Sequence, residues 1–355
     1  MNEQVKNLLA KKPLIISGPC SAETETQMIE TATRLAATGK VDMLRAGIWK
    51  PRTRPGMFEG VGTIGLPWLA EAKKITGLPT TVEVATAKQV EDALRYEVDV
   101  LWIGARTTVN PFSVQEVADA LQGVNIPVLV KNPINPDIDL WMGGIERIQK
   151  AGIAQVGMIH RGFSSYGNTE YRNAPMWHLA IEMKRRNPNM LLICDPSHIC
   201  GRRDILLPIS QQAINLDYDG LMIESHITPD EAWSDASQQI TPEQLATLMQ
   251  AIEWRKENVQ SEEYQTALEK LRQQINQLDD ELLQIISQRM KIAEKIGAYK
   301  KANNITILQT NRWNEILERA YQKGNTLKLS KEFMTKYFDA VHMESIQHQN
   351  KIMED

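Results

Sequence analysis

The 355-residue sequence has few cysteines, no long apolar run and no excess of positive charge. Three cysteines in so long a chain do not form a disulfide framework. No stretch approaches the roughly 18 uncharged apolar residues of a membrane span, and the opening MNEQVKNLLAKKP has no apolar run of the signal-peptide type. The net charge of -4 argues against a nucleic-acid partner. We therefore expect a cytoplasmic protein that binds neither membrane nor nucleic acid.

The first 255 residues alternate short apolar runs with longer, polar, helix-like stretches. The runs are continuous, as in parallel strands that are buried on both faces. About eight such units in about 250 residues predict an α/β fold, the (β/α)8 TIM barrel, with a doubly wound open sheet as the main alternative. The runs are Leu14–Pro19, Val41–Gly47, Thr80–Val84, Val100–Gly104, Pro127–Asn132, Val156–Gly162, Leu191–Ser197 and Gly220–His226.

The pattern changes after residue 255. From Ser261 to about Ala302 proline is absent, and apolar residues recur at steps of three and four, from Leu268 to Tyr299. This spacing predicts one amphipathic helix of about 60 Å with coiled-coil character. A small domain cannot cover so long an apolar stripe, so we expect a homodimer through this helix, with room for a higher oligomer.

Two shorter helices follow in the predicted all-α domain. One runs from about Thr310 to Gln322 and is closed by Gly324, and the other begins after Ser330 as N-cap. We expect the three helices to form an intertwined dimer. The predicted domains are a barrel over residues 1–255, a linker over 256–261 and a helical domain over 262–355.

Charged side chains follow nearly every predicted strand, where a barrel has its active-site mouth. Six of them are cations, and so many like charges are costly unless anions lie among them. Guanidinium groups suit phosphate and carboxylate oxygens, so the expected substrates carry several such groups. For any single cation, a salt bridge with a neighbouring acid is the alternative. The six are Arg45, Lys50, Arg52, Arg106, Lys131 and Arg161.

A second set at the same strand ends combines a thiol, an imidazole and two carboxylates: Cys20, His198, Glu224 and Asp235. Such mixed ligands suit a divalent transition metal. The alternative for Cys20 is a small buried residue, as expected for Cys194 and Cys200. His160 and His226 also end strands, and we expect them to face the mouth.

Seven short motifs resemble type I 3-deoxy-D-arabino-heptulosonate 7-phosphate (DAHP) synthases, over residues 10–250 and in that family's order. They are GPCS (Gly18–Ser21), KPRT (Lys50–Thr53), GAR (Gly104–Arg106), VKNP (Val130–Pro133), DPSH (Asp195–His198), IES (Ile223–Ser225) and WSDASQQ (Trp233–Gln239). The resemblance implies condensation of phosphoenolpyruvate with erythrose 4-phosphate, with release of phosphate. Octulosonate 8-phosphate synthase, a related family, is the alternative, but Pro51-Arg52-Thr53 after Lys50 favours the four-carbon aldehyde.

The same resemblance implies roles for single residues. Cys20, His198, Glu224 and Asp235 would hold one divalent metal ion, Mn2+ above Fe2+, Co2+ or Zn2+. Phosphoenolpyruvate would be held by Arg106, Lys131 and Arg161, with Arg45 and Lys50 nearby. The Lys50–Thr53 motif, with Arg52 and Thr53, would receive erythrose 4-phosphate, Glu83 would act through water, and Lys50 would protonate the aldehyde oxygen. Because the first predicted strand begins by Leu14, we expect no regulatory extension before the barrel.

Cations also interrupt the stripe of the long helix. Arg289 takes the next apolar position after Ile285, and Lys300 lies on the same face, about three turns on. Arg272 lies on another side of the helix, so it can join them only from a partner chain. On the last helix, Ser345 and Gln349 continue the apolar stripe. The alternatives are a snorkelling arginine and a solvated helix end.

This constellation resembles the all-helical chorismate mutases, over Leu268 to about Gln349. The resemblance implies that Arg272, in trans, and Arg289 bind the carboxylates of chorismate, with Arg312 and Ser345 nearby. Lys300 and Gln349 would bond the ether oxygen as prephenate forms. The family often has an acid and a glutamate where this chain has Gln309 and Trp313. The alternative is a dimerisation and effector-binding module, and in either case we expect feedback control of the barrel.

Overall fold

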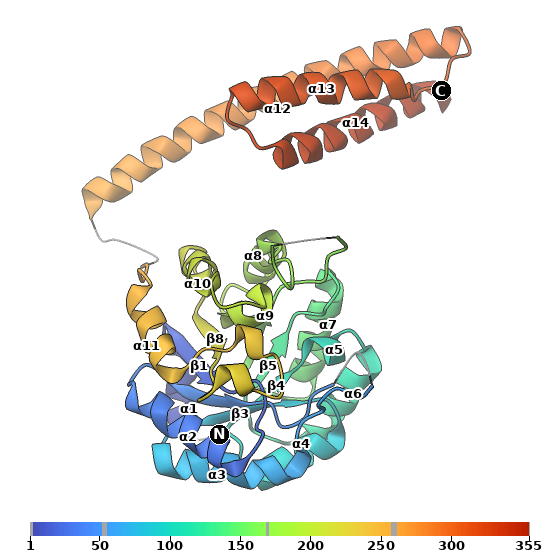
Figure 1. Ribbon diagram of the computed structural model, residues 1–355. Coiled ribbons are helices and arrows are strands. Elements are labelled where there is room, and N and C mark those ends of the chain that lie inside the picture. The colour runs from blue at the N-terminus through green and yellow to red at the C-terminus, as the bar shows by residue number, and fades with distance from the viewer. Residues whose placement is uncertain (1–2, 52–54, 168–169, 257–260, 355) are drawn as a thin grey trace. The chain divides into compact units, whose positions relative to one another are not determined.

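The structure is a computed structural model that describes residues 3–51, 55–167, 170–256 and 261–354. The chain divides into two compact units, Met1–Glu257 and Asn258–Asp355, which are the barrel and the helical domain of Figure 1. A search of the described helices found none with the length and apolar content needed to span a bilayer.

Eight parallel strands of the first unit close into a barrel in chain order (Figure 1). β1 pairs with β8 from Leu14↔Gly220 to Gly18↔Glu224, so the sheet has no free edge there. The predicted TIM barrel is confirmed, and the open sheet is excluded. The strands are β1 Leu14–Gly18, β2 Met43–Ala46, β3 Thr80–Val84, β4 Val100–Ile103, β5 Val128–Lys131, β6 Val156–His160, β7 Leu192–Cys194 and β8 Gly220–Glu224.

Helices surround the strands, and several begin at a side-chain cap. Thr24, Thr86, Asn110, Asp137 and Thr241 each accept a hydrogen bond from a backbone N–H of the first turn. The helices are α1 Glu3–Leu9, α2 Glu25–Ala37, α3 Gly65–Thr76, α4 Ala87–Arg95, α5 Ala105–Thr108, α6 Pro111–Ala120, α7 Ile138–Lys150, α8 Trp177–Arg186, α9 Pro196–Cys200, α10 Leu206–Asn215 and α11 Pro242–Ala251, with 3-10 turns η1 Gly62–Ile64, η2 Pro229–Glu231 and η3 Ala236–Gln238.

The barrel has an inner and an outer core. On β1, Leu14 and Ile16 point into the barrel, and Ile15 between them packs outward against the helices. The sequence did not predict α1, whose Val5 is buried with the inner cluster and closes one end of the barrel. The strand ends at the opposite rim are thereby left for the site.

The second unit is a three-helix domain of α12 Glu262–Ala302, α13 Thr310–Thr326 and α14 Lys331–Glu354. The predicted N-cap Ser330 is confirmed, since it accepts from Phe333 N–H, and Ser261 also caps α12 by accepting from Tyr264 N–H. The predicted end of the second helix is wrong. Gly324 lies inside α13, where a Cβ would come within 2.7 Å of Met334 Cγ, so this glycine serves close packing and not termination.

Within the helical domain, α14 packs against the C-terminal half of α12 and buries part of it. Met290, Ala293 and Gly297 are buried, and a Cβ on Gly297 would lie 3.2 Å from Gln349 on α14. The N-terminal half exposes the predicted stripe, including Leu271, Ile275, Leu278, Leu282 and Ile285. Each of these five side chains is at least 42% exposed.

Candidate functional site

The C-terminal ends of the strands meet in one small cavity. Its lining includes all the described residues predicted for the barrel site: Cys20, Arg45, Lys50, Glu83, Arg106, Lys131, Arg161, His198, Glu224 and Asp235. Arg52 and Thr53 lie outside the described residues. The free volume is about 40 Å³, room for only a few water molecules. An organic phosphate can therefore enter only when some contacts between these side chains open.

Trp102, on β4, supports the cationic side of the cavity. Its ring lies under the guanidinium of Arg45 at 5.1 Å and under the ammonium of Lys131 at 5.6 Å. Its indole N–H donates to Glu83 Oε2 at 3.0 Å. A Cβ on residue 104 would lie 1.9 Å from Glu83 Oε1, so the glycine leaves room for this carboxylate in its present place. The sequence analysis missed Trp102, because an aromatic residue within a strand normally indicates only core packing.

Two of the cations contact acidic side chains, as the salt-bridge alternative predicts. Lys131 Nζ donates to Asp195 Oδ2 at 2.8 Å, and Arg45 Nη2 lies 3.2 Å from Glu224 Oε1. However, Arg45 Nε and Nη1 are buried, and no described group accepts a hydrogen bond from them. Burial also lowers the pKa of Arg161 to about 10. Unsatisfied buried donors are costly, and an anion with several oxygens would satisfy them.

The four predicted metal ligands come together at the same cavity in two pairs. Cys20 Sγ donates to Asp235 Oδ2 at 3.2 Å, and His198 Nε2 lies 3.7 Å from Glu224 Oε1. As arranged, no three His, Cys, Asp or Glu side chains in the described ranges form a group that could hold a metal ion. Closure of the two pairs onto one ion would be needed.

The orientation of His198 nevertheless suits a metal ligand. Its Nδ1 lies 2.8 Å from Asp195 Oδ2, and a carboxylate at this distance favours the proton on Nδ1. The Nε2 lone pair of a neutral ring then faces Glu224 Oε1, which also lies 3.2 Å from Arg45 Nη2. Two acceptors that face one another suit a cation between them. Burial raises the pKa of the Cys20 thiol to about 12. The thiolate that binds a metal therefore needs a cation beside it to form.

Lys50 lies at the centre of these donors. Its Nζ donates to Cys20 Sγ at 2.5 Å and to Ser234 Oγ at 3.2 Å, and it lies 3.7 Å from Asp235 Oδ2. An ammonium in this place is within reach of any oxygen that binds beside the thiol. Lys50 therefore lines the cavity beside the thiol, and its role as proton donor to the aldehyde oxygen stays a prediction.

The helical domain has a larger cavity, of about 630 Å³, between its three helices. Arg289 and Arg312 line it together with apolar side chains that include Leu282, Phe333 and Met334. Arg289 is half-buried, and its Nη1 donates to Ser345 Oγ. Arg312 is exposed and pairs with Glu315.

Lys300, Ser345 and Gln349 lie where α12 and α14 pack together. Ser345 and Gln349 are buried, so the solvated helix end is wrong. Gln349 Oε1 has no partner in the part of the chain described. Lys300 Nζ donates to Ile307 O at 2.5 Å. Arg272 stays apart, exposed on α12 about 25 Å along the helix from Arg289.

Comparison with known proteins identifies both units. The family model described as "DAHP synthetase I family" matches residues 3–261. The chain belongs to this family. A second family model, "Chorismate mutase type II", matches residues 271–350, so the DAHP synthase barrel is fused to a chorismate mutase domain. The resemblances in both halves are confirmed.

Individual relatives of the barrel support its assignment to the DAHP synthase family. The chain is 32% identical over 238 residues to a phospho-2-dehydro-3-deoxyheptonate aldolase of Thermotoga maritima, covering 67% of this chain and 68% of that one. A crystal structure of that enzyme, titled DAHP synthase, has a TM-score of 0.60 and 32% identity, with 67% of each chain covered. A 2-dehydro-3-deoxyphosphooctonate aldolase of Desulfotalea psychrophila is 27% identical, over 66% of this chain and 87% of that one. The octulosonate alternative is therefore not favoured.

The DAHP synthase site contains an arginine that the sequence analysis missed. Arg172, in the loop after β6, lines the cavity and lies 3.1 Å from Asp235 Oδ1. Its Nη1 also donates to Gln238 Oε1 at 2.6 Å. Arg172 lies twelve residues after the end of β6, so its place in the sequence did not mark it as a residue of the barrel mouth.

We expect Arg172→Ala to weaken divalent-metal affinity about tenfold, the lower end for a residue that orients a ligand. The measurement is metal titration by calorimetry, with Arg202→Ala as a matched control, because Arg202 is exposed and pairs with Asp204. An unchanged affinity would show that the pair with Asp235 does not position this carboxylate.

Two histidines that were expected at the mouth are not among the residues that line it. His160 packs among the rings of Trp141, Phe163, Trp177 and Tyr218, and Tyr218 Oη lies 2.8 Å from its Nδ1. His226 Nε2 lies 3.3 Å from Glu23 Oε2. The expectation was wrong for both. His160 and Arg161 are consecutive residues at the end of β6 and point to opposite faces, whereas His226 lies beyond the end of β8.

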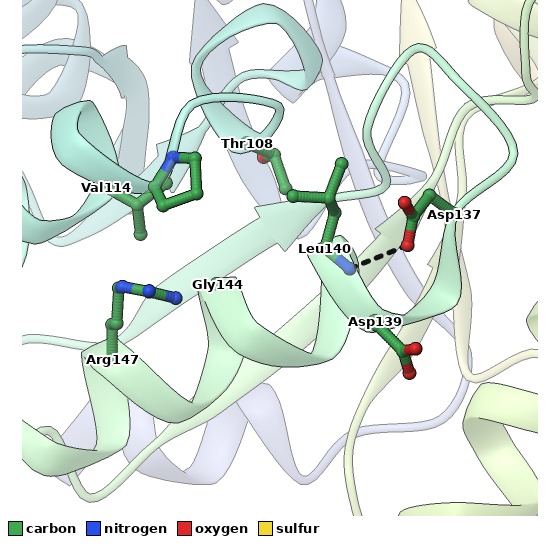
Figure 2. Close-up of a pocket in the computed structure, with 8 residues that line it drawn as sticks. Thr108, Val114, Asp137, Asp139, Leu140, Gly144 and Arg147 are labelled. Carbon is green, nitrogen blue, oxygen red and sulfur yellow. Dashed lines mark hydrogen bonds between the residues drawn. The ribbon is translucent and has the colours of Figure 1, made fainter.

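Another cavity of the barrel, of about 310 Å³, opens between α5–α6 and α7, and Figure 2 shows its lining. Asp137 caps α7 by accepting from Leu140 N–H at 2.9 Å (Figure 2). Thr108 of this lining donates to Lys131 O at 2.9 Å, so it helps to hold the strand end that carries Lys131.

Proposed function

We propose that the barrel condenses phosphoenolpyruvate with erythrose 4-phosphate to DAHP and phosphate in a metal-dependent reaction, and that the helical domain rearranges chorismate to prephenate. The observation that carries the first activity is the buried cationic wall of the mouth. Arg45 keeps two donor atoms that have no partner among the described residues, and Arg161 is buried in the same lining. Oxygens of phosphate and carboxylate groups match those donors.

The metal site is part of this proposal. Cys20, His198, Glu224 and Asp235 would hold one divalent ion, Mn2+ above Fe2+, Co2+ or Zn2+. Their mixed softness and the Asp195–His198 contact support it. When bound, such an ion polarises a carbonyl oxygen as a Lewis acid.

The side chains then perform the remaining tasks. Arg106, Lys131 and Arg161, with Arg45, hold the phosphoenolpyruvate anion, and Arg52 and Thr53 receive the aldehyde substrate, with Glu83 acting through water. Lys50 donates a proton to the aldehyde oxygen while carbon 3 of phosphoenolpyruvate bonds to the aldehyde carbon. Water adds at carbon 2, and the C–O bond to phosphate breaks. The cations stabilise the leaving phosphate.

The mutase reaction needs no nucleophile or base. It needs a dianion held in a compact conformer and donors aimed at the oxygen on which charge grows. Arg289, with Arg312 and Ser345 nearby, would hold the carboxylates, and Lys300 and Gln349 would bond the ether oxygen. The free Oε1 of Gln349 supports this, because a rotation of its amide exposes the N–H2 group to a ligand.

We propose that two copies of the chain complete this site. No described residue of the helical domain covers the exposed stripe on the N-terminal half of α12, and the stripe is as apolar as a helix-pair interface. The apolar cavity beside Arg289 offers a place for it. In that arrangement the partner supplies its own Arg272 to the substrate carboxylates.

The second candidate for the helical domain is a dimerisation and effector module with little catalysis. The observation that favours it is Trp313, which stacks on His342 at 4.1 Å beside the predicted mutase residues. Steady-state assays of the full chain separate the two. We expect both DAHP formation and chorismate turnover, and chorismate binding without turnover would establish the module. Faster use of a five-carbon than of a four-carbon aldehyde phosphate would overturn the DAHP synthase assignment.

Prephenate is expected to inhibit DAHP formation, because the chain joins an early and a later step of one pathway. A ligand that bridges Arg289 and the partner's arginine favours one arrangement of the helical dimer, and a coupling of about 1–3 kcal/mol is enough. The measurement is DAHP synthase rate against prephenate concentration. Arg289→Ala should abolish the inhibition and leave the uninhibited rate unchanged. Equal inhibition of both proteins would place the effector site in the barrel.

A further inference from the structure

His342 is a polar residue of the mutase domain that neither family resemblance assigned. It lies on α14, three residues before Ser345 and seven before Gln349, so the three side chains share one helix face. Ser345 and Gln349 are buried on that face. The His342 side chain therefore belongs to the same wall as two predicted mutase residues.

The Nε2 atom of His342 is buried, and no group in residues 261–354 bonds to it. A buried polar atom without a partner is costly, and protein sites that bind polar ligands are where such atoms are found. The ring stacks on Trp313 of α13 with centroids 4.1 Å apart and planes 16° apart. The indole thus holds the plane of the imidazole, in which a hydrogen bond of Nε2 must lie.

The environment of this ring keeps it neutral. Burial first, and then the charges of Arg289 and Lys300 on α12, lower the pKa of His342, while Asp339 of α14 opposes them. The imidazole is therefore neutral at neutral pH. The contacts of Arg289 link it to this stretch of α14, since its Nη1 donates to Ser345 Oγ and to the carbonyl of Val341, the residue before His342.

We propose that His342 Nε2 hydrogen-bonds to a hydroxyl group of the mutase substrate. The inference rests on the proposed mutase function and adds a specificity residue to it. A hydroxyl group both donates and accepts, so it satisfies Nε2 in either neutral tautomer. A carboxylate would satisfy only the N–H form, and Arg289 already provides for carboxylates.

Trp313 stands at a position where a carboxylate is common in the mutase family. An indole ring cannot accept a hydrogen bond from a hydroxyl group as a carboxylate does. The His342 ring that stacks on Trp313 offers a nitrogen without a partner from the neighbouring helix instead. In this chain the polar contact comes from α14 and its orientation from α13.

The test compares two variants of the full chain, His342→Phe and His342→Gln. Phenylalanine keeps the stack on Trp313 but has no nitrogen, whereas glutamine keeps an amide nitrogen near the place of Nε2. We expect His342→Phe to lower mutase kcat/KM about tenfold, the scale for one neutral hydrogen bond, and His342→Gln to recover most of it. DAHP formation should stay at the wild-type rate in both variants.

An analogue of chorismate that lacks the ring hydroxyl sharpens the test. Wild type and His342→Phe should convert or bind this analogue equally, because the two deletions remove the same contact. His348→Phe is the matched control, since His348 lies on the same helix but contacts Glu294 and Glu344. Its mutase kinetics should match wild type.

The possible outcomes are distinct. Wild-type kinetics in His342→Phe, or equal losses in the phenylalanine and glutamine variants, would overturn the proposal in favour of no role or a packing role. A loss in His342→Phe that persists with the deoxy analogue would also overturn it, since the hydroxyl would not be the partner. No chorismate turnover by the wild-type chain would refute the proposed mutase function itself.

Discussion

Replacing Cys20 by alanine is expected to abolish DAHP formation and to leave chorismate turnover unchanged. The thiol lies in the mouth with His198, Glu224 and Asp235, and the variant removes the one soft ligand of that set. Condensation rates and metal content of the purified protein provide the measurement. We expect the loss of rate to accompany loss of bound metal.

Cys200→Ala is the matched control for this prediction. Cys200 is also a buried thiol, but it lies in the helix-packed outer core and does not line the cavity. Its replacement should retain metal and activity. Full condensation activity in Cys20→Ala would show that the thiol is only a small core residue, which was the alternative from the sequence.

The second large effect is expected for Lys300→Ala, with mutase kcat lowered by at least about 100-fold, the scale for losing one donor to a transition state. The ammonium shares a face of α12 with Arg289, three turns away, and burial lowers its pKa. Uninhibited DAHP formation should hardly change, because the substitution lies in the other unit.

Lys301→Ala separates this role from a general effect on helix α12. Lys301 is the next residue, exposed, and its Nζ donates to Ile352 O at 3.1 Å. We expect its mutase rate to stay near wild type. A wild-type rate in Lys300→Ala would place the ether-binding donor elsewhere in the domain.

The fold was largely predictable because its signals are local. A continuous apolar run bounded by polar residues indicates a buried strand wherever it lies, and all eight runs became strands of the barrel. The spacing from Leu268 to Tyr299 likewise predicted one helix, observed as Glu262–Ala302. The end of α13 was mistaken, since Gly324 serves a contact with Met334 that no local pattern shows.

The sequence by itself determined the barrel, the helical unit and the chemical groups at the strand ends, because these depend on period and chain order. Only the tertiary structure decided which side chains converge. It brought Arg172 to Asp235, set Trp102 beneath two cations and stacked His342 on Trp313. It also turned His160 outward while Arg161 faces the site. Such choices depend on loop paths and on one-residue steps along a strand, where a shift of one position reverses the face.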